Sequence, residues 1–264
     1  MPEHGPPPGY RLGFADEFDG PELDPARWIP HYLPHWSSRE QGAARYAFAD
    51  GGLVLRIDAG QGPWCAEFDG ASRTSTLQTG EYAGPLGSTV GQSRFRPDLV
   101  VREEQPSRLL YGMHHGYVEI RMKATADPEA MVALWMIGYE DVPERSAEIC
   151  VCEIFGNEVS PGSAAVGMGI HPFGDQSLTD EFEKVQVDVD VTEYHVYAAH
   201  WRPGQVDFSV DGAHVKHVGQ APDYPLQLML GIFAFPSDTP GPYPKRFPVD
   251  YIRIYTPAGA TSAR

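Results

Sequence analysis

The sequence predicts an all-β fold of the sandwich or jelly-roll type, because short strands and turn residues alternate along most of its length. Its 264 residues include 28 glycines and 25 prolines, which interrupt regular structure. Between them lie short runs in which apolar and polar residues alternate with period two, the pattern of strands buried on one face. Few stretches carry a helical period. The length suits one β-sandwich domain over residues 1–264, with an ordered core at about 9–257.

The expected strands follow one another without any stretch that resembles a domain linker. In chain order they are residues 53–57, 116–123, 132–138, 148–155, 194–201, 206–210, 214–218, 226–233 and 249–255. Asp211 and Gly212 separate two of these runs and predict a tight hairpin turn. A polar loop that contains Pro143 separates the strongly apolar run at 132–138 from the run at 148–155.

The net charge of −16 limits the classes of partner. An anionic surface repels phosphate backbones and anionic membranes, so we expect no nucleic-acid and no membrane partner. A neutral polymer meets no such barrier. No run is long enough to span a bilayer, and the N-terminus lacks the pattern of a signal peptide. We therefore expect a cytoplasmic protein if Met1 is the native start, and otherwise a secreted protein whose leader has been removed.

The three cysteines, Cys65, Cys150 and Cys152, do not describe a disulfide scaffold, because their number is odd. Cys150 and Cys152 cannot bridge each other without backbone strain. Cys65 could pair with either, although buried free thiols are favoured. The sequence lacks the motifs of serine- or metal-dependent hydrolases and of phosphate-binding loops. We therefore expect chemistry that requires no cofactor.

Two glutamates inside an apolar strand are the most informative feature of the chain. Glutamate is rarely buried without a partner, and Glu148 and Glu153 would point to opposite faces of a regular strand. A β-bulge between Cys150 and Glu153 would bring both onto one face, about 13 Å apart at the backbone. Sheet curvature and inward-leaning side chains narrow that gap toward the roughly 5–5.5 Å of a retaining glycosidase pair. The alternative is an exposed Glu148 at an edge and a Glu153 paired with arginine.

The segment Glu148-Ile-Cys-Val-Cys-Glu153 resembles the E-x-D-x-x-E signature of family 16 glycoside hydrolases, the laminarinase-like enzymes. Further segments resemble strands of that family in the expected order, from the opening of the domain to its closing strands. They are residues 14–19, 117–123, 133–138, 224–230 and 249–255. The resemblance implies a concanavalin A-like β-jelly roll of two curved antiparallel sheets, with substrate bound on the concave face.

The resemblance also implies a function. Glu148 would be the nucleophile and Glu153 the general acid/base of a retaining, endo-acting hydrolase of a β-linked polysaccharide, with neutral β-1,3-glucan the favoured substrate. Glu153 should be neutral and Glu148 ionised before the first step. A transglycosylase on the same site and a carbohydrate-binding protein with weakened catalysis are the alternatives.

The sequence departs from the family signature at Cys150, where the family has an aspartate that hydrogen-bonds the nucleophile. A thiol is a weak donor, so we expect reduced or altered activity. A second departure is the segment Thr79-Gly80-Glu81, which falls where many members have an arginine facing the cleft.

Three further residues are candidates for substrate contact. Trp135 lies on an apolar strand and Trp36 in an aromatic loop, and either indole could stack on a pyranose ring. His171 resembles a family histidine that touches sugar hydroxyls. In each case the alternative is a purely structural side chain.

Many family members hold a structural calcium on the convex side, and the resemblance extends to its ligands. Asp250 matches the ligand aspartate, with backbone oxygens near Glu17 and Gly52 as possible partners. Hard oxygen ligands suit calcium. The alternative is an aspartate hydrogen-bonded to a turn.

Overall fold

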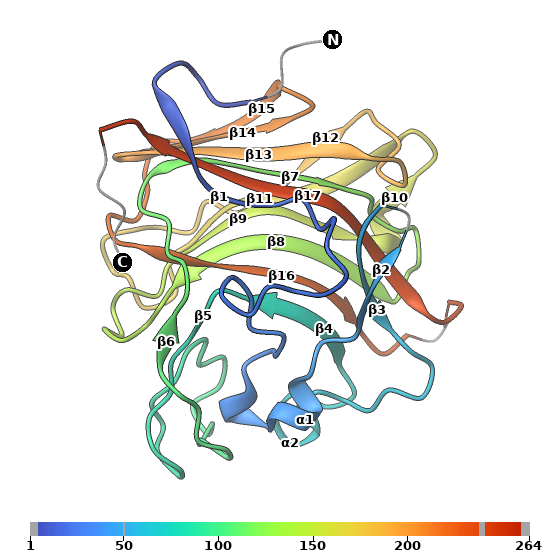
Figure 1. Cartoon of the computed structure of the whole chain (residues 1–264), viewed down its shortest axis with the longest axis vertical. Helices are drawn as coiled ribbons and strands as arrows, with labels where there is room; N and C mark the ends of the chain where they lie inside the picture. The colour runs from blue at the N-terminus through green and yellow to red at the C-terminus, as the bar shows by residue number, and fades with distance from the viewer. Residues whose placement is uncertain (1–4, 50, 238–240, 260–264) are drawn as a thin grey trace.

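The computed structural model describes residues 5–49, 51–237 and 241–259, and it confirms the predicted fold class. Two large antiparallel sheets carry most of the structure (Figure 1). In spatial order the first sheet contains β15 (Ala213–Val218), β14 (Gln205–Val210), β13 (His195–Arg202), β7 (Gly116–Met122), β17 (Lys245–Pro257), β3 (Gly52–Ile57) and β2 (Tyr46–Ala49), with β1 (Tyr10–Asp16) paired to β17.

The second sheet holds the segment with the two glutamates at its middle. In spatial order it contains β10 (Val159–Ser160), β11 (Ser163–His171), β9 (Glu148–Phe155), β8 (Ala130–Gly138), β16 (Leu226–Ala234) and β4 (Arg73–Gln78), with β12 (Glu183–Val187) paired to β11. The remaining elements are short: β5 (Gly80–Glu81), β6 (Arg108–Leu109), α1 (Arg39–Gly42), α2 (Ala66–Asp69) and the 3-10 turns η1 (Pro34–Trp36) and η2 (Gly156–Glu158). In the described parts of the chain, no helix is long and apolar enough to cross a membrane.

Strand β8 shows how the sequence builds two packed faces. Val132, Leu134 and Met136 point into the main core between the two sheets, together with apolar residues of β7, β13 and β17. The alternate residues of β8, among them Trp135, belong to a second and smaller apolar cluster on the other face of the sheet. Both faces are covered, which is why this strand is apolar throughout rather than alternating.

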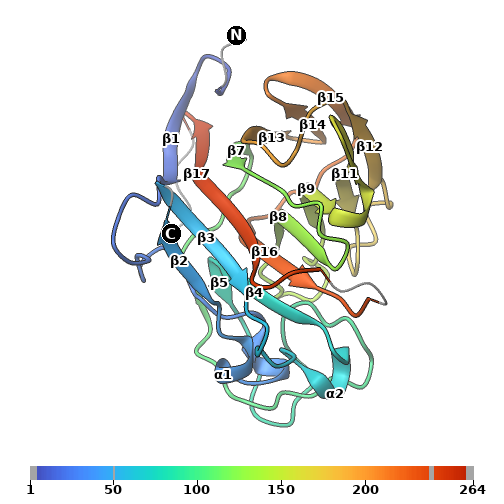
Figure 2. The ribbon, with the colours of Figure 1, turned by 90° about the vertical axis from the view of Figure 1, so that its right-hand side faces the viewer.

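The second cluster is covered by the irregular part of the chain. Helices α1 and α2 and the β5–β6 pair gather at one end of the molecule, below the curved strands β16 and β4 (Figures 1 and 2). Loop residues Leu33, Trp64 and Leu99 are buried there against β8 and β16. This packing builds walls beside the outer face of the second sheet.

The predicted hairpin and thiols are confirmed. Asp211 and Gly212 both have positive φ, 49° and 76°, and they connect β14 to β15 as expected for a two-residue turn. All three cysteines are buried and free.

Candidate active site

A β-bulge in β9 turns both glutamates toward the same side of the sheet, as the sequence analysis required. Cys150 lies opposite Trp135 of β8 whereas Cys152 lies opposite Leu134, so Val151 is an extra residue. The register against β11 shifts at the same point. Because of this insertion, Val151 and Cys152 both enter the main core. The parity changes after them, and Glu153 returns to the face that carries Glu148.

This face forms the floor of a cleft with a volume of about 860 Å³. Glu148, Cys150 and Glu153 line one side of it, from β9. Trp135 and its alternate neighbours line the centre from β8, and residues of β16 line the far side. Loops that include Arg94 complete the walls. The two glutamates therefore reach one cleft, and the alternative of an exposed edge with an arginine-paired Glu153 does not apply within the described residues.

Burial and mutual repulsion set the protonation of the pair. Burial, followed by the negative charge of Glu153, raises the pKa of Glu148 to about 8. Burial also raises the pKa of Glu153, but His171 and Lys184 oppose that rise. Gly167 of β11 pairs with Glu153 of β9 on one side and with Lys184 of β12 on the other.

This result corrects the expected order of protonation. From the family resemblance we expect an ionised Glu148 and a neutral Glu153. The positive charges lie beside Glu153 instead, and among the described residues none makes a hydrogen bond or ion pair with the Glu148 carboxyl. The neighbouring positive charges therefore favour ionisation of Glu153, and within the described part of the chain no such charge favours ionisation of Glu148.

Cys150 lies between the two glutamates in the cleft floor and is almost fully buried. Its thiol points to the carbonyl oxygen of Gly167 at 3.7 Å, a weak contact. Burial and the charges of Glu148 and Glu153 raise its pKa well above the usual value, so the thiol stays neutral. It supplies no negative charge and no strong donor to the pair.

The two candidate tryptophans have different environments. Trp135 lines the cleft and lies 6.1 Å from the ring of Phe233, so it stays a candidate for stacking on sugar. Trp36 is a correction. Its side chain is 0% exposed, its indole nitrogen donates to the Gln92 carbonyl at 2.8 Å, and its ring packs on His35. Trp36 is therefore a core residue with no face free for a sugar.

His171 lies at the end of β11 and pairs in register with Glu148. Its Nδ1 lies 2.9 Å from Asp180, and its ring stacks on Phe182 at 4.5 Å. It does not line the cleft itself but acts on Glu153 through its charge. Contact with sugar hydroxyls stays a prediction.

Sequence reasoning missed most of the aromatic lining. Tyr32 packs edge-on against Trp64 at 4.6 Å and against Phe233 at 5.2 Å, and Phe233 stacks parallel to Phe235. All four rings line the cleft. Phe233 and Phe235 could have been found from the period of two along β16, because they continue the parity of Met229, another residue of the lining.

Glu140 was also missed, and no sequence signal marks it. It lies in the loop after β8 with a positive φ of 60° and accepts a hydrogen bond from the Ser93 amide at 2.7 Å. Burial raises its pKa to about 7. With Asp69, Glu148 and Glu153 it gives four acidic side chains against one arginine among the described residues that line the cleft. This balance disfavours anionic ligands.

Glu81 does not line the cleft. Its side chain is buried and pairs with Arg39 at 3.0 Å and with Arg108 at 2.8 Å. These ion pairs join the β5–β6 pair to helix α1. The departure from the family at this position thus belongs to the packing of the loops.

The residues expected to hold calcium do not fit the ion as they are placed. Asp250 pairs with Arg121, and Glu17 is bound by Arg253 through two contacts of 2.7 Å. Gly52 does lie against the backbone at Asp250. The Asp250 carboxylate, the expected side-chain ligand, thus faces a guanidinium whose charge opposes a cation. Calcium at this position stays a prediction that would require Arg121 to move.

Comparisons with known proteins agree with this geometry. The model of the family described as Glycosyl hydrolases family 16 matches residues 109–252, which include β7, β8, β9 and β11. Comparison with curated proteins finds no match.

Solved structures extend the likeness to the whole chain. A GlcNAcα1-4Gal-releasing endo-β-galactosidase from Clostridium perfringens is 27% identical with a TM-score of 0.81, over 99% of this chain and 66% of that one. The chain thus spans about two thirds of that enzyme's length. A laminarinase from Flavobacterium sp. UMI-01 is 19% identical with a TM-score of 0.64, over 93% and 100%. An endo-1,3-β-glucanase from Thermotoga petrophila is 18% identical with a TM-score of 0.62, over 94% and 98%.

Proposed function

The chain belongs to glycosyl hydrolase family 16, and we propose on this basis that Glu148 and Glu153 make it a retaining hydrolase of a neutral β-linked polysaccharide. The family and its structural neighbours support an endo-acting glycoside hydrolase. The observation that supports a catalytic pair is the bulge at Val151, which brings both carboxyls from one strand into one cleft. A retaining mechanism needs a close pair of carboxyls.

In the proposed reaction Glu153 protonates the glycosidic oxygen while Glu148 attacks the anomeric carbon. The bond from that carbon to the leaving oxygen breaks, and a glycosyl ester of Glu148 forms. Glu153, now ionised, takes a proton from water, and the water oxygen displaces Glu148. Two displacements retain the anomeric configuration. Glu148 must be ionised for the first step, so the raised pKa of this residue predicts a modest rate below about pH 8.

The cleft supports a neutral substrate. Its floor is apolar and aromatic, which suits the apolar faces of pyranose rings, and its acidic side chains outnumber the single arginine. A sulfated polymer would be repelled. β-1,3-Glucan remains the first candidate. A β-galactosyl chain is the second, because the neighbour at 27% identity is named as an endo-β-galactosidase.

A panel of laminarin, mixed-linkage β-glucan and neutral β-galactan tests this function. Hydrolysis of laminarin is expected, with early release of oligosaccharides of several lengths, as an endo-acting enzyme produces. Cleavage of galactan alone would identify a β-galactosyl chain as the substrate. Products longer than the substrate would indicate a transglycosylase. If the wild-type protein and a Glu148→Gln variant both bind glycan and neither releases reducing ends, the protein is a binding protein and the hydrolase proposal fails.

Restoring aspartate at position 150 should increase the rate. A carboxyl donates a far stronger hydrogen bond than a thiol, and one hydrogen bond to an ionised Glu148 is worth about 1.5–3 kcal/mol, which corresponds to roughly 10- to 150-fold in rate. Cys150→Ala is the control, since the present thiol contact to Gly167 is already weak. Reducing-sugar release by both folded variants is compared. An aspartate variant no faster than the alanine variant would contradict a role for the residue at 150.

A further inference from the structure

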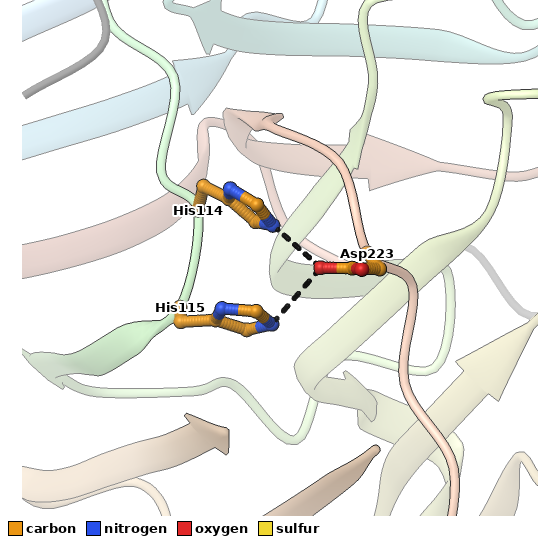
Figure 3. Close-up of side chains that lie close together, drawn as sticks. All are labelled: His114, His115 and Asp223. Carbon is orange, nitrogen blue, oxygen red and sulfur yellow. Dashed lines mark hydrogen bonds and ion pairs between the residues drawn. The ribbon is translucent and has the colours of Figure 1, made fainter. Parts of the chain in front are cut away.

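A cluster of two histidines and one aspartate lies outside the cleft and is not used by the proposed function. His114 and His115 directly precede β7, and Asp223 lies in the segment between β15 and β16 (Figure 3). In the figure both imidazole rings point toward the aspartate carboxylate. All three potential ligand atoms lie within 4.8 Å of one another.

The distances suit a shared metal ion better than a simple ion pair. Nε2 of His114 lies 2.9 Å from Oδ1 of Asp223, which is a hydrogen bond. Nε2 of His115 lies 3.7 Å from the same oxygen, which is too long for one. Ligands of a tetrahedral zinc ion at about 2.0–2.1 Å lie about 3.3 Å apart, between these two values.

His115 supplies the second observation. Its Nε2 atom is buried and has no hydrogen-bond partner within the described residues. A buried polar nitrogen without a hydrogen-bond partner destabilises the folded state. The Nε2 atom of His115 points toward the Asp223 carboxylate but lies too far from it for a hydrogen bond. A metal ion between the two would satisfy it.

The two imidazoles are held in place before any ion binds. Their rings stack at 4.3 Å, and Trp201 packs edge-on against His115 at 5.1 Å. His115 has a left-handed backbone with φ 59°, and a Cβ on the next residue, Gly116, would meet the Tyr255 carbonyl oxygen at 2.4 Å.

From this geometry we propose that His114, His115 and Asp223 bind a divalent transition-metal ion, with zinc as the preferred ion. Two imidazoles and a carboxylate suit zinc, and water completes the coordination because Asp223 is 83% exposed. The net charge of −16 favours a cation. The ion would cross-link two segments 109 residues apart. Tyr224, next to Asp223, accepts a hydrogen bond from the amide of Ala147, the residue that precedes β9. The proposed metal site is therefore one residue away from a contact that holds the start of β9.

Titration of the tag-free chain with zinc chloride tests the proposal, by calorimetry and by thermal melting. The wild-type protein should bind one equivalent, and zinc at about 100 times its Kd should raise Tm by roughly 5 °C. His115→Gln and Asp223→Asn should each weaken binding tenfold or more and reduce the shift in Tm to about half or less. His115→Gln is the sharper test, because it leaves the pair of His114 and Asp223 intact.

A double variant, His214→Gln with His217→Gln, is the matched control. These exposed histidines also face an aspartate, Asp207, but Arg202 already pairs with that carboxylate. The control should bind zinc as the wild-type protein does. No binding by the wild-type protein, unchanged binding by His115→Gln, or an equal loss in the control would each overturn the proposal.

Discussion

Replacement of Glu148 by alanine should lower kcat for polysaccharide hydrolysis by roughly a thousandfold or more, because this change removes the carboxylate proposed to form the glycosyl ester. Glu153→Ala should cause a loss of roughly 10²–10⁴-fold, the usual contribution of a general acid/base. Both residues line the same cleft from β9. Reducing-sugar release measures the loss. Glu193→Gln, on an exposed surface pair with Lys123, should retain full activity.

Azide separates the two roles. In Glu148→Ala a small anion can occupy the nucleophile's place and yield a glycosyl azide of inverted configuration. In Glu153→Ala, azide attacks the glycosyl-enzyme and yields the retained configuration. Identical azide products from the two variants, or full activity in either, would contradict the assignment.

Glu148→Gln should also stabilise the fold at neutral and alkaline pH. The pKa of Glu148 is raised by burial to about 8, so the folded state holds this proton more tightly than the unfolded chain does. The stabilisation that the protonated Glu148 side chain gives to the folded state is therefore fully present below the ordinary pKa of glutamate. It is lost as the pH rises toward the raised pKa of about 8. Glutamine carries no charge to be desolvated. A higher Tm than wild type at pH 8 and a smaller difference at pH 4 are expected.

The second large effect is structural. Lys245→Met should lower the free energy of unfolding by about 3–5 kcal/mol. The Lys245 side chain is 0% exposed, and its ammonium group contacts Glu129 and lies 2.7 Å from Asp127. Both carboxylates are less than 10% exposed. Removal of the cation leaves two buried negative charges without compensation, and urea unfolding measures the loss.

Two comparisons make this prediction specific. Adding Asp127→Asn and Glu129→Gln to Lys245→Met should recover most of the stability, because a buried ion network costs little when all its charges are removed together. Arg96→Ala breaks an exposed pair with Asp98, with side chains 46% and 54% exposed, and should cost less than about 1 kcal/mol. A Lys245→Met variant as stable as Arg96→Ala would contradict the account.

The sequence predicted structure best where burial and the period of a strand together fix the direction of a side chain. Nine strands of the two sheets and the turn at Asp211 were predicted from alternation and turn residues, whereas β1, β2, β4, β11 and β12 were missed. The bulge in β9 was predicted because two glutamates of opposite parity in an apolar strand need a register shift to share a cleft. The position of Trp135 in the cleft could be predicted in a similar way, because alternation along β8 fixes the face of the sheet on which its side chain lies.

Loop residues were less predictable. Trp36 lies in a loop that other loop residues bury, and Glu140 enters the cleft through a local backbone conformation with positive φ. Neither has a periodic pattern that fixes its direction. The pKa order of the pair depends on Lys184 of β12, which is distant in sequence from Glu148. Such features follow from tertiary packing rather than from local pattern.

Mass spectrometry of a trapped intermediate tests the central claim most directly, that the bulged strand β9 places the nucleophile Glu148 and the acid/base Glu153 in one cleft. The protein is incubated with an activated 2-deoxy-2-fluoro glycoside of the sugar that the panel identifies. Fragmentation of the labelled peptide should place one glycosyl group on Glu148. A glycosyl group on Glu153 or on any residue outside β9 would contradict the claim.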